Sequence, residues 1–214
     1  MKNTIANSKR TRTQNYNHCI YLIGWVGYFI AFFLAEKLIP VEKCYPVHSV
    51  LDDIIPFCEF FILPYVLWYF LIIGTFLYFM FYNPNNFKWL MKFVLVSMVL
   101  ATIIFVAFPN RQDLRPTEFL RDNFCVDLVK YIYSIDTNTN VCPSMHVTIS
   151  IGIASAWIKE KSVAAWVKAL LIAFCVLVCI SVVFVKQHSI IDIFVAIPVC
   201  VIAELTCFKS FKNA

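Results

Sequence analysis

The sequence contains little charge. Only 14% of its 214 residues are Asp, Glu, Lys or Arg, whereas 61% are hydrophobic, and the mean hydropathy is +0.75. A soluble domain of this length would need far more charged side chains to cover its surface. The apolar residues also occur in runs of about the 20 residues that a helix needs to cross a bilayer. These features exclude an ordinary soluble protein and predict an integral membrane protein.

Several chemical signatures are also missing. The nine cysteines form no CxxC pair and no Cys/His spacing of the kind that zinc requires, so we expect no structural metal and no cofactor. The apolar runs lack the strict alternation of an outer-membrane barrel. No G-x-S-x-G sequence marks a serine hydrolase. The centres of the apolar runs are almost free of charge, which disfavours a channel or transporter.

Six apolar runs are rich in Leu, Ile, Val and Phe, and they predict an all-α membrane protein with a bundle of six transmembrane helices. We expect one membrane domain over residues 18–208, preceded by a basic segment at 1–17 and followed by a tail at 209–214. The fourth run is short. The runs cover about residues 18–39, 57–82, 89–108, 143–158, 163–185 and 188–208.

Lysine and arginine are unevenly distributed between the two sides of this bundle. With the N-terminus in the cytoplasm, eleven of the 18 bases fall on the inner side, together with one acid, Glu160, and seven bases and most acids fall outside. The positive-inside rule therefore predicts cytoplasmic termini in a multi-pass protein of the cell membrane. The net charge of +5 then serves to anchor the protein against anionic lipid, and we expect no nucleic-acid partner. The inner bases are Lys2, Lys9, Arg10, Arg12, Lys88, Lys92, Lys159, Lys161, Lys168, Lys209 and Lys212.

Two segments lie on the outer side of this predicted topology. Residues 40–56 are expected to form an interfacial loop or a short helix. Residues 109–142 are unusually long for a connection between adjacent helices, and loops of this size commonly carry function. Three polar motifs lie within or beside the second segment, and the topology drawn from charge alone brings all three to the outer face. They are FPNRQDLRP at 108–116, NVCPSMHV at 140–147 and VKQHSIID at 185–192.

The second motif stands at the start of the fourth run. Proline suits the first helical position, so we expect the helix to begin at Pro143. The amides of Ser144 and Met145, with the Ser144 hydroxyl, would then face an anion at the positive end of the helix dipole. His146 can donate a proton to a departing oxygen. An ordinary helix start with a routine Ser and His would have the same sequence, so this motif alone is not specific.

The third motif contains His188 and Asp192, four residues apart at the start of the last run and therefore on one helical face. A carboxylate at the membrane boundary is costly without a partner, and His188 is the nearest candidate. Such a pairing fixes the imidazole tautomer and raises its basicity, which suits a general base or a nucleophile toward phosphorus. A structural His–Asp hydrogen bond that caps the helix is the alternative.

Three basic residues lie near these motifs. The guanidinium group of Arg115, which precedes Pro116, matches phosphate oxygens in a bidentate fashion. Arg111 and Lys186 are candidates for a second and a third positive group. The alternative for each is contact with lipid headgroups, the commoner role of a boundary Lys or Arg.

In this order, Arg-Pro, Pro-Ser-x-His and His-x-x-x-Asp resemble the three signature motifs of the PAP2 (type 2 phosphatidic acid phosphatase) superfamily, over about residues 108–196. The resemblance implies a six-helix membrane fold and metal-independent hydrolysis through a phosphohistidine intermediate. It also implies that His188 attacks phosphorus, that Asp192 orients it, and that His146 protonates the leaving group.

The resemblance further implies that Arg115 and Ser144 hold the phosphate. Two positions that are usually basic in the superfamily are occupied here by Phe108 and Val182, so other bases are expected to supply that charge. In these departures the chain is similar to the branch related to inositol phosphorylceramide and sphingomyelin synthases. Those enzymes pass a phospho-headgroup to an alcohol instead of water.

The sequence thus predicts a phosphatase for a membrane lipid phosphate at the outer face. Its substrate would be a phosphomonoester or diphosphate lipid of the phosphatidic acid, phosphatidylglycerol phosphate or polyprenyl diphosphate class. A lipid phosphotransferase is the alternative, because water and a lipid hydroxyl need the same base. A bundle that only binds lipid phosphates is disfavoured, since a binder has no use for a paired His and Asp. The sequence does not determine the oligomeric state.

Overall fold

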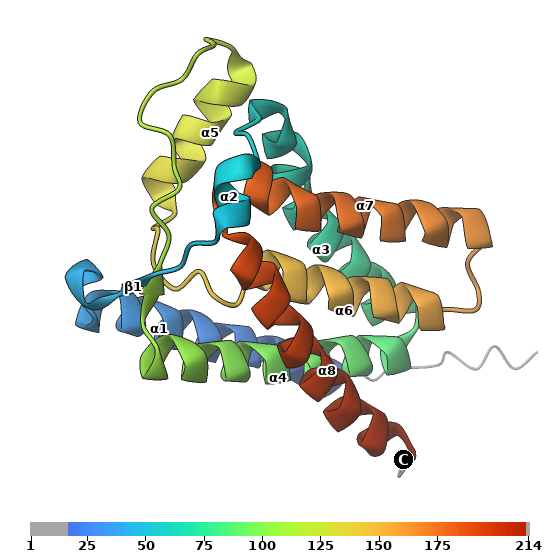
Figure 1. The fold of residues 1–214 in the computed structure, drawn as a ribbon. Coiled ribbons are helices and arrows are strands. Elements are labelled where there is room, and N and C mark those ends of the chain that lie inside the picture. Colours follow the sequence, from blue (N-terminus) through green and yellow to red (C-terminus); the bar gives the residue numbers. More distant parts are fainter. Residues whose placement is uncertain (1–16, 213–214) are drawn as a thin grey trace, which may run out of the picture.

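The computed structural model describes residues 17–212 and consists almost entirely of helices (Figure 1). The predicted inner bases Lys2, Lys9, Arg10 and Arg12 lie outside the described residues. Short 3-10 helices carry the label η. Within residues 17–212 the elements are, in order, η1 Asn17–Leu22, α1 Ile23–Leu38, η2 Val41–Lys43, β1 Tyr45–Pro46, α2 Val50–Ile54, η3 Glu59–Phe61, α3 Ile62–Tyr82, α4 Pro84–Ala107, β2 Asn110–Arg111, α5 Phe124–Ile135, α6 Met145–Lys159, α7 Ala165–Phe184 and α8 Ile190–Lys212.

The long helices account for the apolar composition. Among the described residues, five helical segments are long and apolar enough to cross a membrane: Cys19–Leu38, Glu59–Tyr82, Pro84–Ala107, Ala165–Phe184 and Ile190–Cys207. The chain is therefore an all-α protein with the helices of a multi-pass membrane protein. The short fourth run forms α6, whose 15 residues rise only about 22 Å, less than the roughly 30 Å of a hydrocarbon core. A sixth membrane-spanning helix and the cytoplasmic termini stay predictions.

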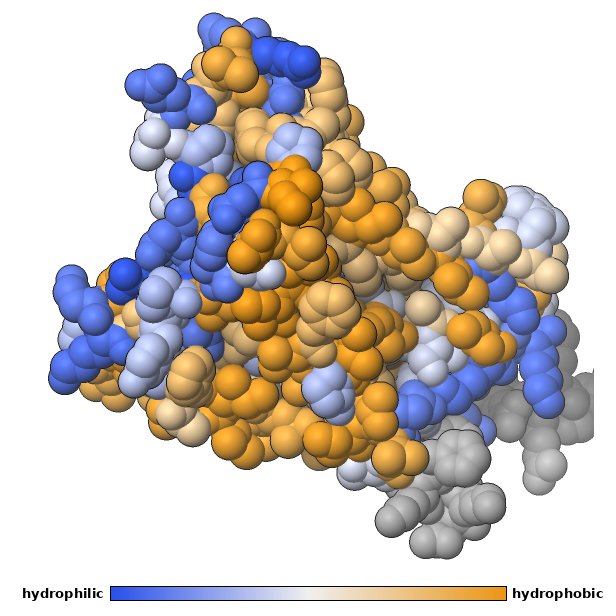
Figure 2. All heavy atoms as spheres, viewed as in Figure 1, coloured by the Kyte–Doolittle hydropathy of each residue, from blue (hydrophilic) through white to orange (hydrophobic). Residues whose placement is uncertain are grey.

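The surface has the pattern expected of a protein that sits in a bilayer. Apolar side chains cover the middle of the face in Figure 2, over the long helices. Hydrophilic side chains gather toward the end that carries β1 and α5 and again at the lower right. Large apolar residues such as Phe70, Trp166 and Phe194 are more than half exposed. In water such a surface would aggregate, whereas in lipid it is the contact surface.

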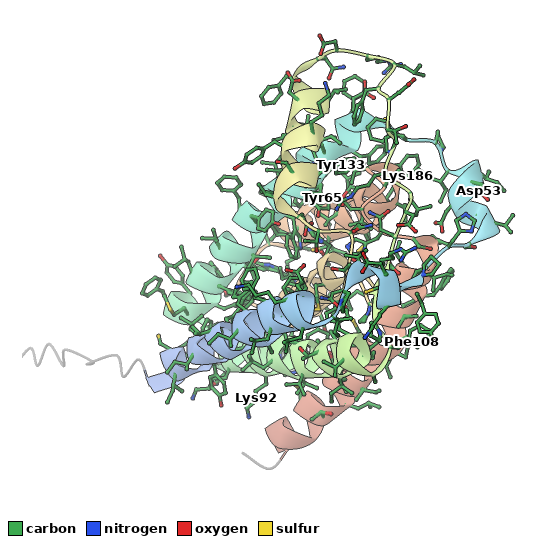
Figure 3. All side chains as sticks on the ribbon, turned by 90° about the vertical axis from the view of Figure 1, so that its left-hand side faces the viewer. Asp53, Tyr65, Lys92, Phe108, Tyr133 and Lys186 are labelled. Atoms are coloured by element: carbon green, nitrogen blue, oxygen red, sulfur yellow. The ribbon has the colours of Figure 1, made fainter. Side chains whose placement is uncertain are left out.

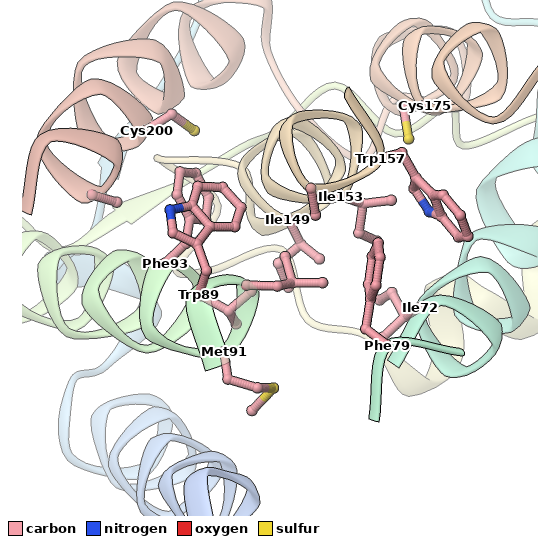
Figure 4. Packing of buried hydrophobic residues seen from close by; sticks show 14 of the residues in the cluster. Ile72, Phe79, Trp89, Met91, Phe93, Ile149, Ile153, Trp157, Cys175 and Cys200 are labelled. Carbon is pink, nitrogen blue, oxygen red and sulfur yellow. The ribbon is translucent and has the colours of Figure 1, made fainter. Parts of the chain in front are cut away.

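Helix α6 lies at the centre of the bundle, among α3, α4, α7 and α8 (Figures 1 and 4). Its buried residues Ile149, Ile153 and Trp157 pack in one core cluster with side chains of these neighbours. A Cβ atom at Gly152 would stand 2.6 Å from Phe93 on α4, so glycine allows these two helices to approach closely. A polar link adds to the packing, because Nε1 of Trp157 donates a hydrogen bond to Thr75 on α3 (3.2 Å).

The two outer segments meet at one end of the bundle. Strands β1 and β2 pair in parallel, with Tyr45 opposite Asn110. The Asn110 side chain then accepts hydrogen bonds from the amides of Val141 (2.9 Å) and Cys142 (2.8 Å), and donates one to the Cys142 carbonyl (3.0 Å). Segments that are far apart in the sequence are thereby fixed beside the start of α6. Residues 40–56 form η2, β1 and α2, which agrees with the predicted loop or short helix.

The other end is joined by a buried carboxylate. Glu160, directly after α6, accepts hydrogen bonds from Asn83 (2.8 Å), between α3 and α4, and from Asn86 (3.2 Å) in the first turn of α4. It also accepts hydrogen bonds from the amide (2.8 Å) and hydroxyl (2.7 Å) of Ser162. Burial acts to raise the pKa of Glu160, but these hydrogen bonds outweigh it and hold the pKa below its ordinary value. The one acid predicted among the inner bases therefore connects two turns of the bundle.

The structure corrects several predicted boundaries. Helix α4 begins at Pro84 because the Asn83 side chain accepts from the Asn86 amide (3.1 Å) and caps it, five residues before the predicted start. Helix α5 interrupts the segment 109–142, which was predicted as a loop. Helix α6 begins at Met145 and not at Pro143, because Ser144 is its N-cap residue. All nine cysteines are free.

Candidate active site

A cavity of about 360 Å³ opens between α1, α3, α4 and α6, beneath residues 136–141. Its body is apolar and rich in aromatic rings, whereas one end is polar and contains both His146 and His188. No Lys or Arg is among the described residues that line it. The aromatic part contains Trp25, Tyr28, Phe29, Phe32, Trp68 and Tyr69, and the polar end contains Asp136, Thr137, Thr139, Asn140 and Gln187 beside the two histidines. The cavity therefore has the form that a lipid with a polar headgroup would fill.

His188 and Asp192 form the predicted pair. Nδ1 of His188 lies 3.0 Å from Oδ2 of Asp192, and the carboxylate is fully buried. The motif predicted that His188 lies within the last helix, but α8 begins only at Ile190. The contact with Asp192 is therefore made across the start of the helix. The same Oδ2 accepts the Ser189 amide (3.0 Å). Among the described residues no hydrogen bond engages Nε2 of His188, and this nitrogen is available for chemistry while Asp192 holds the other.

His146 stands opposite, in the first turn of α6. Its ring stacks on Tyr65 (centroids 4.3 Å apart) and also contacts the tilted Trp68 ring (4.1 Å), both on α3, and it lies 5.8 Å from the His188 ring. These aromatic contacts restrict the orientation of the imidazole. Nε2 of His146 is buried and has no hydrogen-bond partner among the described residues. A buried polar atom without a partner requires an explanation, and a ligand oxygen in the cavity would provide one.

The start of α6 differs from the expectation at Ser144. The Ser144 hydroxyl accepts from the Val147 amide (3.5 Å), as an N-cap does. The Ser144 amide donates to the Asp192 carbonyl (3.2 Å), so it is not free to bind an anion. This bond joins the start of α6 to the start of α8 and thereby places the two histidines together. Met145 lines the cavity, and the predicted role of its amide in binding an anion stays a prediction.

Arg115 is fully engaged by the protein. Its guanidinium group donates to Gln187 Oε1 through two nitrogens (3.1 and 2.6 Å) and to the carbonyls of Tyr133 (3.2 Å), Asp136 (3.0 Å) and Thr137 (2.9 Å). It also lies over the Tyr133 ring, 4.6 Å from the centroid. These carbonyls belong to the C-terminal end of α5, where a cation is favoured. Arg115 does not line the cavity, so the geometry favours a positioning role over the predicted contact with phosphate.

Arg111 and Lys186 are also held elsewhere. Arg111 contacts Asp113 through Nε (3.0 Å) and donates through one terminal nitrogen to the carbonyls of Val41 (2.9 Å) and Cys44 (3.2 Å). It thus ties β2 to the segment around η2. Lys186 is buried, and its ammonium group donates to carbonyls at the end of α2. Neither residue lines the cavity.

Phe108 and Val182, the two positions where the resemblance led us to expect a base, have apolar surroundings or backbone contacts. Phe108 stacks on Tyr45 (4.7 Å between centroids, 6° between planes) at the C-terminal end of α4, where Figure 3 labels it. Val182 is fully buried in α7, and its carbonyl accepts from the amides of Gln187 (3.0 Å) and His188 (3.1 Å). The Val182 carbonyl thus shapes the turn that presents His188.

Three residues were not predicted, two at the polar end of the cavity and a third, Asp52, outside it. Asp136 is half-buried and accepts weak hydrogen bonds from Tyr65 (3.4 Å) and Gln187 (3.3 Å). Burial raises the pKa of Asp136, while the nearby His188 and Arg115 act in the opposite direction. Gln187 joins Arg115 to Asp136. Asp52, from the other outer segment, is buried at the start of α8. Only Asp52 carried a local signal, the Ser-x-x-Asp pattern of a capping box.

Comparison with known proteins gives no match to this chain. No protein-family model and no curated protein matches the sequence, and no solved structure matches the fold. The functional assignment therefore depends on the residues of the cavity and their geometry.

Proposed function

We propose that this chain is a membrane lipid phosphatase of the PAP2 type, acting at the extracytoplasmic face through a phosphohistidine. The observation that carries the proposal is the pair of histidine rings, 5.8 Å apart, at the polar end of an aromatic cavity. Reacting atoms approach to about 3–3.5 Å before bond formation, so two rings at this separation can flank one phosphorus atom. A carboxylate holds Nδ1 of one ring, which supports His188 as the nucleophile.

The proposed reaction has two steps, formation of the phosphohistidine and its hydrolysis. Nε2 of His188 attacks phosphorus, the bond to the leaving oxygen breaks, and that oxygen takes a proton from His146. His146 then accepts a proton from a water molecule, whose oxygen attacks the phosphohistidine as the P–N bond breaks. Inorganic phosphate leaves and both histidines return to their starting forms. Asp192 orients His188 throughout and stabilises the positive charge that develops on it.

The cavity offers neutral donors where cations were expected. Trp25 and Trp68 line it, and the Nε1 atoms of both are buried without a hydrogen-bond partner among the described residues. The first turn of α6 adds the positive end of a helix dipole near Met145 and His146. These groups are the ones we expect to hold the headgroup oxygens. The aromatic body would take the hydrocarbon chain.

The decisive experiment measures phosphate release by the purified protein from phosphatidic acid, phosphatidylglycerol phosphate and undecaprenyl diphosphate. We expect turnover of at least one of them, and a covalent phosphoryl group that is acid-labile, as a phosphohistidine is. His188→Ala should abolish both. His48→Ala is the matched control, because His48 is exposed on the outer segment and pairs only with Asp53 (2.8 Å) among the described residues. Full activity of the His188 variant would refute the mechanism.

The apolar lining of the cavity favours a lipid alcohol as an alternative acceptor to water. The same two histidines would then transfer a phospho-headgroup instead of hydrolysing it. Analysis of products from a lipid labelled in its phosphate distinguishes the two reactions. Free phosphate supports the phosphatase, whereas label in a new phospholipid supports the transferase.

A further inference from the structure

One carboxylate outside the cavity reaches the helix that follows His188. Asp52 lies on α2, in the first outer segment, and only 3% of it is exposed. Its Oδ1 accepts from the Ile190 amide (2.8 Å), and its Oδ2 accepts from the Ser189 hydroxyl (2.6 Å). A buried carboxylate is costly unless it is hydrogen-bonded, and these partners lie more than 130 residues away in the sequence.

The same carboxylate also builds its own helix. Ser49 is the N-cap of α2, and its amide donates to Oδ2 of Asp52 (2.8 Å) in a capping box. Asp52 therefore caps two helices at once, α2 through Ser49 and α8 through Ile190. Its neighbour Asp53 has no such role, because it is exposed and pairs with His48 (2.8 Å). Figure 3 shows Asp53 at the outer edge of α2, away from the bundle.

Ser189 connects this carboxylate to the proposed nucleophile. Its hydroxyl donates to Asp52, while its amide donates to Oδ2 of Asp192 (3.0 Å). The same Oδ2 atom lies 3.0 Å from Nδ1 of His188. A continuous path of hydrogen bonds thus runs from α2 through Ser189 and Asp192 to the imidazole.

A second contact braces the turn on the other side of His188. The Lys186 ammonium donates to the carbonyls of Asp52 (2.7 Å) and Ile55 (2.5 Å), at the C-terminal end of α2. The Lys186 backbone has a φ of 53°, a left-handed conformation that lysine seldom adopts. The turn with His188 is therefore attached to α2 both before and after the histidine.

We propose that Asp52 is a positioning residue for His188. It fixes Ser189 and the first turn of α8, and through them it sets the orientation of the Asp192 carboxylate toward the imidazole. The role rests on the proposed function, because it concerns the nucleophile of that reaction. Asp52 does not line the cavity, so it acts on the rate of attack and leaves substrate binding unchanged. The first outer segment thus becomes part of the active site's framework.

The test compares Asp52→Asn with Asp53→Asn in the full-length protein. Asparagine has nearly the same shape but cannot accept from all three donors at once. We expect the rate constant for phosphohistidine formation, measured by rapid quench, to fall by about 10- to 100-fold, since small misplacement of a reacting group has effects of this size. KM should change less than twofold. Asp53→Asn should leave both values at the wild-type level.

Two readouts separate positioning from a loss of folded protein. Unfolding lowers the amount of phosphoenzyme but does not change its rate constant of formation. In an Asp192→Asn background, Asp52→Asn should cause little further loss, because its effect passes through Asp192. An unchanged rate constant in Asp52→Asn would overturn the proposal. So would an undiminished effect of Asp52→Asn in the Asp192→Asn background.

A measurement without substrate keeps this inference apart from the proposed function. The Nδ1 proton that His188 shares with Asp192 should give a downfield proton resonance, assigned by its loss in His188→Ala. Asp52→Asn should broaden or shift it, and Asp53→Asn should not. If wild-type protein turns over no lipid phosphate while this shift appears, the positioning role stands and the proposed function fails. An unshifted resonance in Asp52→Asn overturns the positioning role itself.

Discussion

Replacement of Arg115 can distinguish two roles for this residue. The sequence predicts that Arg115 binds phosphate, whereas its contacts indicate that it holds the end of α5 in place. If Arg115 binds substrate phosphate, Arg115→Ala should raise KM and leave the fold intact. If it holds the end of α5 to Gln187, the same change should destabilise the protein. Arg115→Lys sharpens the contrast, because lysine keeps the charge but cannot reproduce the five hydrogen bonds of the guanidinium fork.

The contacts set the magnitude. A hydrogen bond contributes about 0.5–1.5 kcal/mol net, and more when one partner is charged. Arg115 is only half-buried, and bonds made by one group are not additive, so we expect a loss of about 2–4 kcal/mol for Arg115→Ala. Arg115→Lys should lose more than half of that. KM should stay within about threefold in both variants, since Arg115 does not line the cavity.

Thermal unfolding in detergent, followed with a thiol-reactive dye, measures this loss. Six of the nine free cysteines are buried and become reactive when the chain unfolds. Lys130→Ala on α5 is the control, because its pairing with Asp127 is long (3.9 Å) and exposed, so it should change stability by about 0.5 kcal/mol or less. Wild-type stability of Arg115→Ala together with a tenfold rise in KM would refute the positioning role and restore the phosphate contact.

Three further predictions concern the proposed acid and the packing of the helices. His146→Ala should lose about 10²-fold or more on an alkyl phosphate but much less on a p-nitrophenyl ester, which needs no protonation; equal losses would rule out the acid role. Gly152→Ala should cost about 1–3 kcal/mol by crowding Phe93, whereas Gly74→Ala, with open space around it, should cost nothing. Glu160→Gln should cost about 1–3 kcal/mol at neutral pH. The pKa of Glu160 is lowered in the folded protein, so the stabilisation from its charged form is present above the ordinary pKa of 4.5 and is lost as the pH falls below that value. When the free energy of unfolding is measured against pH, Glu160→Gln should therefore lack this acid-sensitive part.

Hydropathy predicted the long helices well because their apolar length is what both the bilayer and the core require. It failed where polar caps decide the boundary. Helix α4 starts five residues before its apolar run because Asn83 caps it and Pro84 suits the first position. Helix α5 was missed because it is short, amphipathic and embedded in a polar segment, although Asn123 caps it in the ordinary way.

The site was predictable in part for the same reason. His146, His188 and Asp192 lie at or directly before helix starts, and the predicted topology placed these helix starts at the same end of the bundle. The contacts of the basic residues were not predictable, because a sequence shows that a base is present but not which acceptor it meets. Arg115 meets the carbonyls that end α5, and Lys186 meets those that end α2. Both outer helices end in carbonyls that need donors, and the nearest bases supply them.

The bundle and the segments outside it contribute to the candidate site in different ways. The bundle brings the two histidines together, because Tyr65 of α3 stacks on His146 and the start of α6 is bonded to the start of α8. The segments 40–56 and 109–142 brace the turn that carries His188, because Asp52 bonds to Ser189 and Ile190 and Arg115 bonds to Gln187. A substitution in residues 40–56 or 109–142 should therefore change the rate constant of the reaction more than it changes substrate binding. A substitution among the apolar residues of the cavity should weaken substrate binding more than it changes the rate constant, since apolar side chains form most of the lining.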